Sequence, residues 1–154
     1  MDFLFQSILN GILAGCIYAL FAMGLTLIYG VLNFVNFAHG ELIMWGAYFL
    51  YFLMGKPFGL PLPIALIPAL LLTILLGIGM DRFVFKPLRT ANRLTLLIAA
   101  LGLSFLLRNG AQFLWGAELR TYGFEIKRGL RILGISITLN QVAIILTSIV
   151  CIVF

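Results

Sequence analysis

Charged side chains are scarce in this chain. Of its 154 residues, five are acidic, ten are basic and one is histidine, so 10% are charged while 63% are hydrophobic. A soluble domain is about 25% charged and about 45–50% apolar. With a mean hydropathy of +1.16, the chain has too few polar side chains to cover a surface in water. The composition therefore excludes an ordinary soluble domain and predicts a polytopic helical membrane protein. The net charge of +5 then concerns topology and anionic lipid rather than nucleic acid.

Residue types that build metal centres and catalytic sites are equally few. The two cysteines, Cys16 and Cys151, lie in separate apolar runs without C-x-x-C spacing, and no histidine stands at ligand spacing from them. The chain has no phosphate loop of the form G-x-x-x-x-G-K-S/T and no visible nucleophile–base set. We therefore predict that it is not an enzyme and that it binds no metal or cofactor of its own. A cleaved secretory signal is not expected, because the N-terminus carries Asp2 and lacks a basic region.

Long apolar runs dominate what remains. They predict about five transmembrane helices, at residues 3–32, 42–54 (or from about 38), 62–80, 94–116 and from Leu139 or Gln141 to 154. The predicted fold class is an all-α integral membrane bundle forming a single domain over residues 1–154. The last segment, from Gln141, would cover only ~21 Å of a ~30 Å hydrocarbon core. We interpret the chain as a fragment of a longer protein.

Two connections are informative. Arg82, Lys86, Arg89 and Arg93 make residues 81–93 a dense basic loop, which favours the cytoplasmic side and places the N-terminus outside. Topology and contact with lipid headgroups are its expected roles, with a specific ligand site as the alternative. Asn92 is the expected N-cap of the next helix. Alternating isoleucine and leucine near residues 130–138 indicates a small extracytoplasmic β-hairpin.

The stretch from Asn33 to Glu41 is a polar stretch inside otherwise apolar sequence. It holds the only histidine, and Glu41 is the only formally charged residue between Phe3 and Gly55. Glycines and asparagines weaken a helix, so we expect a broken helix near 33–41 and a new helix starting near His39–Glu41. Glu41 in a first helical turn would be favoured by the helix dipole. The alternative is an interfacial turn with Glu41 exposed to headgroups.

Spacing adds a further hypothesis about these residues. If the backbone stayed helical, one polar face would carry Thr26, Tyr29, Asn33, Asn36 and Gly40 and lead into His39 and Glu41. Such a face in lipid must meet protein or water, because hydrocarbon leaves its donors and acceptors unpaired. Arg108 lies about 12 Å inside the end of the fourth span and is expected to face the bundle or a wet path. A pairing of Arg108 with Glu41 is a hypothesis that a charge swap would test.

Several short runs carry a resemblance to a known family. The chain resembles the inner-membrane permeases of branched-chain amino acid ABC importers, and is similar to their LivH-type subunit. The runs that carry this resemblance are Asn10-Gly11, Tyr18-Ala19-Leu20, residues 24–32, Asn36-Phe37-Ala38-His39-Gly40-Glu41, Arg82, residues 86–89, Arg93-Leu94, Ile98-Ala99, residues 102–104 and Asn109. The urea and amide permeases of the same superfamily share the Asn-Phe/Met-Ala-His-Gly-Glu pattern, so the substrate stays open between these classes.

The resemblance implies a multi-pass permease of the bacterial inner membrane. Such permeases pair as two related subunits, here with a LivM-like partner, and receive substrate from a periplasmic binding protein. Two cytoplasmic ATPases supply the energy from ATP. Within this chain, the expected substrate-pathway or gating residues are Thr26, Tyr29, Asn33, Asn36, His39, Gly40 and Glu41.

Two departures from the family matter. Its members are about twice as long, so the loop that docks the ATPase is expected beyond Phe154. A non-transporting membrane fragment is therefore an alternative. The family often has an uncharged polar residue where Arg108 stands, so no role is carried over to Arg108.

Overall fold

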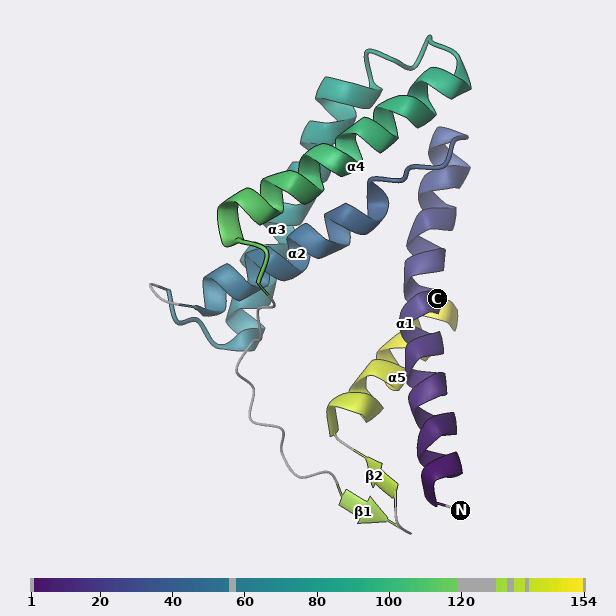
Figure 1. The fold of residues 1–154 in the computed structure, drawn as a ribbon, viewed down its shortest axis with the longest axis vertical. Helices are drawn as coiled ribbons and strands as arrows, with labels where there is room; N and C mark the ends of the chain where they lie inside the picture. Colours follow the sequence, from purple (N-terminus) through teal and green to yellow (C-terminus); the bar gives the residue numbers. More distant parts are fainter. Residues whose placement is uncertain (1, 56–57, 119–129, 133–134, 138, 154) are drawn as a thin grey trace. The chain divides into compact units, whose positions relative to one another are not determined.

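The computed structural model describes residues 2–55, 58–118, 130–132, 135–137 and 139–153. Within them lie five α-helices, a short π-helical segment and one pair of strands (Figure 1). In chain order these are α1 (Asp2–Leu32), α2 (His39–Met54), α3 (Leu62–Met80), η1 (Asp81–Phe85), α4 (Arg93–Trp115), β1 (Leu130–Ile132), β2 (Ile135–Ile137) and α5 (Leu139–Val153). The five predicted apolar segments are therefore confirmed as helices.

Three of the helical segments are long and apolar enough to cross a membrane. They are Phe3–Leu32, Leu62–Phe85 and Arg93–Trp115. The other two helices are shorter, with 16 residues in α2 and 15 in α5. At 1.5 Å per residue α2 covers about 24 Å, less than a hydrocarbon core of ~30 Å. A short helix entered through a break is what the sequence predicted at this position.

The chain divides into two units, residues 1–27 with 123–154 and residues 28–122, which are described separately. In the first unit, β1 and β2 pair antiparallel with Arg131 opposite Ser136, which confirms the predicted hairpin near 130–138. The Ser148 hydroxyl of α5 donates to the Cys16 carbonyl oxygen of α1 at 3.4 Å. Most of the α1 surface is exposed within this chain. A predominantly apolar exposed helix is typical of contact with lipid or with further protein.

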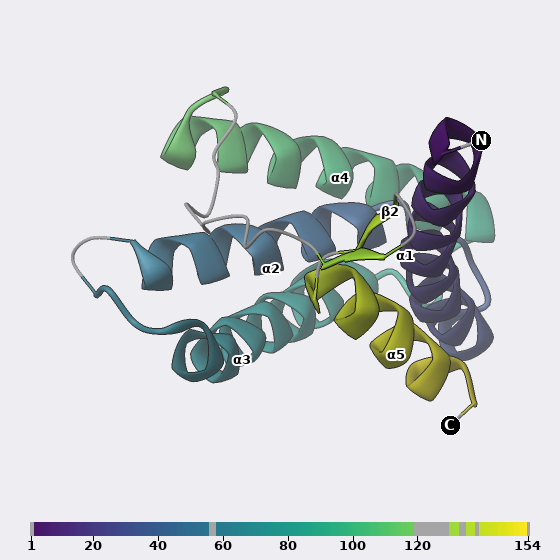
Figure 2. The same ribbon diagram turned by 90° about the horizontal axis from the view of Figure 1, so that it is seen from below.

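In the second unit, α2 packs against both α3 and α4. Figure 2 shows α2 lying between them. Small residues allow the close approach to α3: Ala65 and Ala69 are buried, and a Cβ added to Gly46 would come within 3.1 Å of the Thr73 hydroxyl oxygen. The main core lies toward the other end of the unit. It consists of Phe34, Ala38, Met80, Phe85, Leu96, Ala100 and Leu107.

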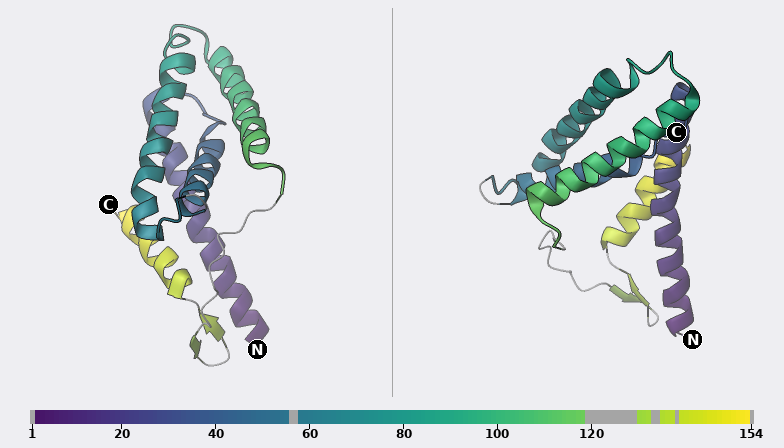
Figure 3. Two further views of the ribbon diagram at one scale, coloured as in Figure 1. Left: turned by 90° about the vertical axis from the view of Figure 1, so that its left-hand side faces the viewer. Right: turned by 45° about the horizontal axis from the view of Figure 1, so that its top comes forward.

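The connection from α3 to α4 differs in part from the predicted loop. Residues 81–85 continue the helix as η1, and only residues 86–92 form the turn that joins α3 to α4 at one end of the unit (Figure 3). Phe85 explains the extension, because continuing the helix buries its ring to 2% exposure in the core. Asn92 occupies the N-cap position of α4 as predicted, although its side chain makes no capping hydrogen bond.

The break between α1 and α2 is made by two asparagines with different roles. Asn33 ends the helical run with a positive φ of 57°, a conformation that asparagine tolerates better than most residues, and its side chain is exposed. Asn36 is buried, and its Oδ1 accepts a hydrogen bond from the Ala38 N–H at 3.1 Å. Its own carbonyl oxygen accepts from the His39 N–H at 3.1 Å. Asn36 thus holds the turn that starts α2, and the predicted helix break is confirmed.

Candidate functional site

Glu41 is the buried acid of the second unit. It lies in the first turn of α2, as predicted, and its side chain is 10% exposed. Burying a carboxylate is costly unless charge and hydrogen bonds compensate for the lost water. The helix dipole contributes some of this compensation, because Glu41 lies where the first backbone N–H groups are concentrated. The rest must come from side chains on a neighbouring helix.

Two side chains of α4 provide the remaining compensation for the buried Glu41 carboxylate. The Ser104 hydroxyl donates to Glu41 Oε1 at 3.3 Å, and Arg108 Nε lies 3.3 Å from the same oxygen. Ser104 and Arg108 are four residues apart, so one face of α4 presents both. We call Glu41, Ser104 and Arg108 the Glu41 cluster. The hypothesis of a Glu41–Arg108 pair is confirmed, and the alternative of a headgroup-exposed Glu41 is not observed.

Arg108 is only partly used by this contact. Its side chain is 62% exposed within the chain, and a guanidinium has five N–H donors. The contact to Glu41 is made through Nε, so it does not by itself require the terminal nitrogens. A charged group at membrane depth avoids hydrocarbon and faces protein or water. Within this chain, the Arg108 side chain therefore keeps exposed surface beyond its contact with Glu41.

Aromatic side chains extend the same α2–α4 contact toward the C-terminal ends of both helices. The Trp45 indole N–H donates to the Leu107 carbonyl oxygen at 3.0 Å. Its ring lies edge-on to Phe49 and Trp115, each with a centroid distance of 5.4 Å, and Tyr48 stacks on Trp115 at 5.0 Å. These contacts fix how α2 and α4 are rotated against each other. The rotation in turn keeps Glu41 facing Ser104 and Arg108.

The other predicted site residues are only partly brought together. The turn and the start of α2 gather Asn36, which is buried, with His39, which is half-buried, and Gly40, which is exposed. By contrast, Thr26 donates its hydroxyl to the Ala22 carbonyl oxygen of its own helix, and Tyr29 is 50% exposed. Because α1 ends at Leu32, the helical condition for one continuous polar face is not met.

Two features of the site were missed by sequence reasoning. Ser104 was not identified as a partner of Glu41, although its four-residue spacing from Arg108 was a usable signal. The indole bond of Trp45 to the Leu107 carbonyl had no signal, because any carbonyl of a neighbouring helix can accept it.

Comparison with known proteins identifies the family. Residues 7–154 match the family described as the permease component of the branched-chain amino acid transport system. The chain belongs to this permease family. The resemblance, which extends over roughly residues 8–116, is thereby confirmed, and the helices that can cross a membrane agree with it.

Curated relatives of this permease chain carry matching names. BraD of Pseudomonas aeruginosa, a "high-affinity branched-chain amino acid transport system permease protein", is 38% identical over 111 residues. LivH of Escherichia coli K12 and LivH of Salmonella typhimurium, with the same descriptive name, are 36% and 32% identical over 111 residues. Each match covers 68% of this chain and 36% of the relative, so the matched part of the chain spans about a third of the length of these relatives. No solved structure gives a significant match.

Proposed function

We propose that this chain forms part of the membrane-spanning permease of an ABC importer that carries branched-chain amino acids across the bacterial inner membrane. Its membership of the permease family and the names of its relatives support this substrate class. The partners we propose are a second, LivM-like permease subunit, two cytoplasmic ATPases and a periplasmic substrate-binding protein. The chain itself would hydrolyse nothing, and the ATPases would use the ATP.

One observation within the chain carries the proposed mechanism. A buried carboxylate at the start of a helix is held by a hydroxyl and a guanidinium from a neighbouring helix, and the guanidinium keeps exposed N–H donors. A path for a zwitterionic amino acid needs polar groups inside an apolar bundle, and such groups are costly elsewhere in a membrane. We assign the exposed end of Arg108 to the wall of that path, where its donors can meet a substrate carboxylate.

The helix break gives this site a way to move. The turn before α2 contains Asn33 in the left-handed region, and a change in the backbone torsions of this turn would let α2 change its tilt. Separation of Glu41 from Arg108 would accompany such a tilt. In this proposal Asn36, His39, Gly40 and Glu41 act as the gate, while Tyr29 and Asn33 lie along its approach.

Uptake by intact cells tests the proposal. We expect deletion of the gene to lower the initial rate of labelled leucine, isoleucine and valine uptake at low concentration, and the restored gene to recover it. Uptake of labelled urea and of a short amide serves as the matched comparison and should not change. Loss of urea or amide uptake with normal leucine uptake would assign the chain to the related permeases for those substrates. No change in any uptake would contradict an importer function.

A further inference from the structure

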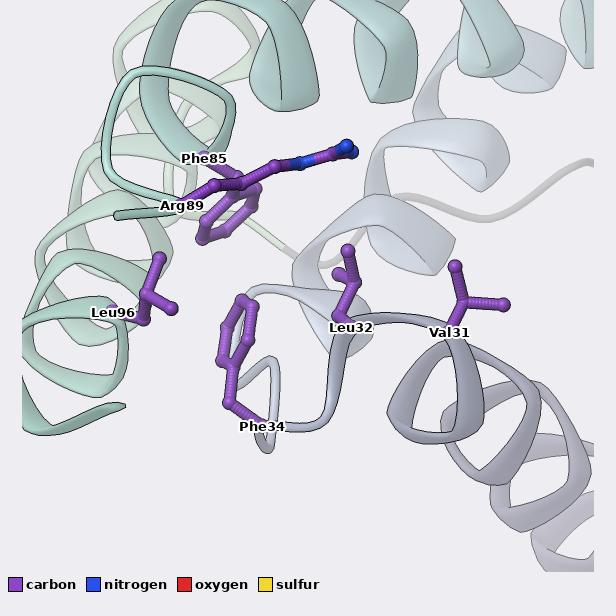
Figure 4. Close-up of a pocket in the computed structure, with 6 residues that line it drawn as sticks. All are labelled: Val31, Leu32, Phe34, Phe85, Arg89 and Leu96. Carbon is purple, nitrogen blue, oxygen red and sulfur yellow. The ribbon is translucent and has the colours of Figure 1, made fainter. Parts of the chain in front are cut away.

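A pocket of about 250 Å³ lies at the end of the second unit where α1 stops and α4 starts. Figure 4 shows the six residues that line it, which come from α1, the turn after it, η1, the turn before α4 and α4 itself. They are Val31, Leu32, Phe34, Phe85, Arg89 and Leu96. The rings of Phe34 and Phe85 meet at a centroid distance of 5.3 Å. The pocket thus has an apolar floor and one cationic side chain.

Arg89 is placed to receive an anion. In Figure 4 its side chain extends over the ring of Phe85, and its guanidinium points toward the side formed by Leu32 and Val31. One terminal nitrogen contacts Asp81 at 3.3 and 3.4 Å, and the two side chains are 57% and 44% exposed. An exposed ion pair at this distance is weak. The guanidinium therefore keeps donors for a second acceptor oxygen.

The charges around the pocket favour an anion over a zwitterion or a cation. Arg82, Lys86 and Arg93 are exposed within a few residues of Arg89, and Asp81 is the one acid in this segment. An amino acid would need an acceptor for its ammonium group, and the lining offers no acidic side chain. Basic pockets between membrane helices, near their polar ends, are typical binding sites for anionic lipid headgroups.

We propose that this pocket binds one anionic phospholipid, with its phosphate on Arg89 and the upper part of an acyl chain against Phe34, Phe85 and Leu96. The volume of the pocket suits partial enclosure of a lipid, because it is below the ~300 Å³ at which pockets enclose a whole small ligand. Only the headgroup-proximal part of the lipid would lie inside, and the rest would continue into the bilayer. The bound lipid would link the end of α1 to the start of α4.

Lipid titration of the assembled permease tests this site. The protein is purified with its partner subunits in neutral detergent, and native mass spectrometry counts retained phosphatidylglycerol or phosphatidylcholine at increasing lipid concentration. We expect one phosphatidylglycerol to be retained in preference to phosphatidylcholine. Arg89→Ala should weaken its binding by about tenfold, because charge-assisted hydrogen bonds to the phosphate are lost.

Two further variants distinguish lipid binding in the pocket from non-specific attraction of anionic lipid to the basic residues of this segment. Lys86→Ala removes the same charge from the same segment but from a residue outside the lining, and should weaken binding less than about threefold. Asp81→Asn frees Arg89 from its acidic neighbour and should tighten binding, which gives a gain that misfolding cannot imitate. Equal losses in Arg89→Ala and Lys86→Ala, or equal retention of both lipids, would overturn the proposal. Absence of any retained phosphatidylglycerol would also overturn it and indicate that protein fills the pocket.

Discussion

Arg108→Gln is expected to lower the free energy of unfolding of the permease by about 2–3 kcal/mol, because it leaves the buried Glu41 carboxylate without its cationic partner. Ser104 alone, at 3.3 Å, cannot compensate a buried charge. Adding Glu41→Gln to the same chain should recover most of the loss, since a neutral amide needs no counter-charge and can still bond to Ser104. Unfolding of the purified protein by SDS in mixed micelles measures these differences.

The single variant Glu41→Gln should be milder than Arg108→Gln. Arg108 is 62% exposed, so its guanidinium can turn to water or to other protein when the acid is gone, and the expected loss is below about 1 kcal/mol. The exposed Asp81–Arg89 pair is a matched control, because its shortest distance is also 3.3 Å. Arg89→Gln should likewise cost less than about 1 kcal/mol. A double variant as unstable as Arg108→Gln alone, or an equal loss in the Arg89→Gln control, would contradict a buried Glu41–Arg108 pair.

The second large effect is expected at the turn before α2. Asn36→Gly should lower the free energy of unfolding by about 2 kcal/mol more than Asn33→Gly, because it removes the buried acceptor of the Ala38 N–H. The same substitution at Asn33 should be nearly neutral, since glycine adopts a φ of 57° readily and no buried bond is lost. Both variants gain the same backbone freedom when unfolded, so the difference isolates the side-chain bond.

The same SDS unfolding measurement compares the two glycine variants. Asn36→Asp is a useful third variant, because its carboxylate oxygen can still accept from the Ala38 N–H, although it introduces a buried charge. Equal stability of Asn33→Gly and Asn36→Gly would show that the Asn36 bond does not hold the turn. α2 would then be positioned by its packing on α3 and α4 alone.

Much of this fold follows from sequence because each apolar run is bounded by polar or helix-breaking residues. The break at 33–38 was predictable from two asparagines and flanking glycines, and α2 starts at His39 as expected. The Glu41–Arg108 pair was predictable for a different reason. Charges are so few inside the apolar segments that each had almost no other partner. The pair was therefore predictable from the small number of charged residues and not from the spacing of apolar residues.

Rotation of one helix against another could not be predicted in this way. A helix that is apolar on all sides has no periodic signal to show which face packs inward. The Trp45 contact to Leu107 depends on that rotation and appeared only in the structure, whereas the Ser104 contact had one sequence signal, its four-residue spacing from Arg108. The extension of α3 into η1 was missed because Asp81 and Arg82 resemble a loop, whereas burial of Phe85 keeps the helix going. The prediction of a continuous polar face was wrong because it required the helix to continue to Gly40, whereas α1 ends at Leu32.

In the proposed function, the Glu41 cluster belongs to the path of a branched-chain amino acid importer. The initial rate of labelled leucine uptake by cells carrying the Glu41→Gln/Arg108→Gln double variant, at matched abundance in the membrane, tests this role. Lys86→Gln, a change at an exposed basic residue outside the cluster, is the control. This role predicts a stable double variant whose uptake falls by at least about tenfold, with the control near the native rate. Native uptake by the double variant would contradict it, and would make the cluster a brace between α2 and α4 that takes no part in transport.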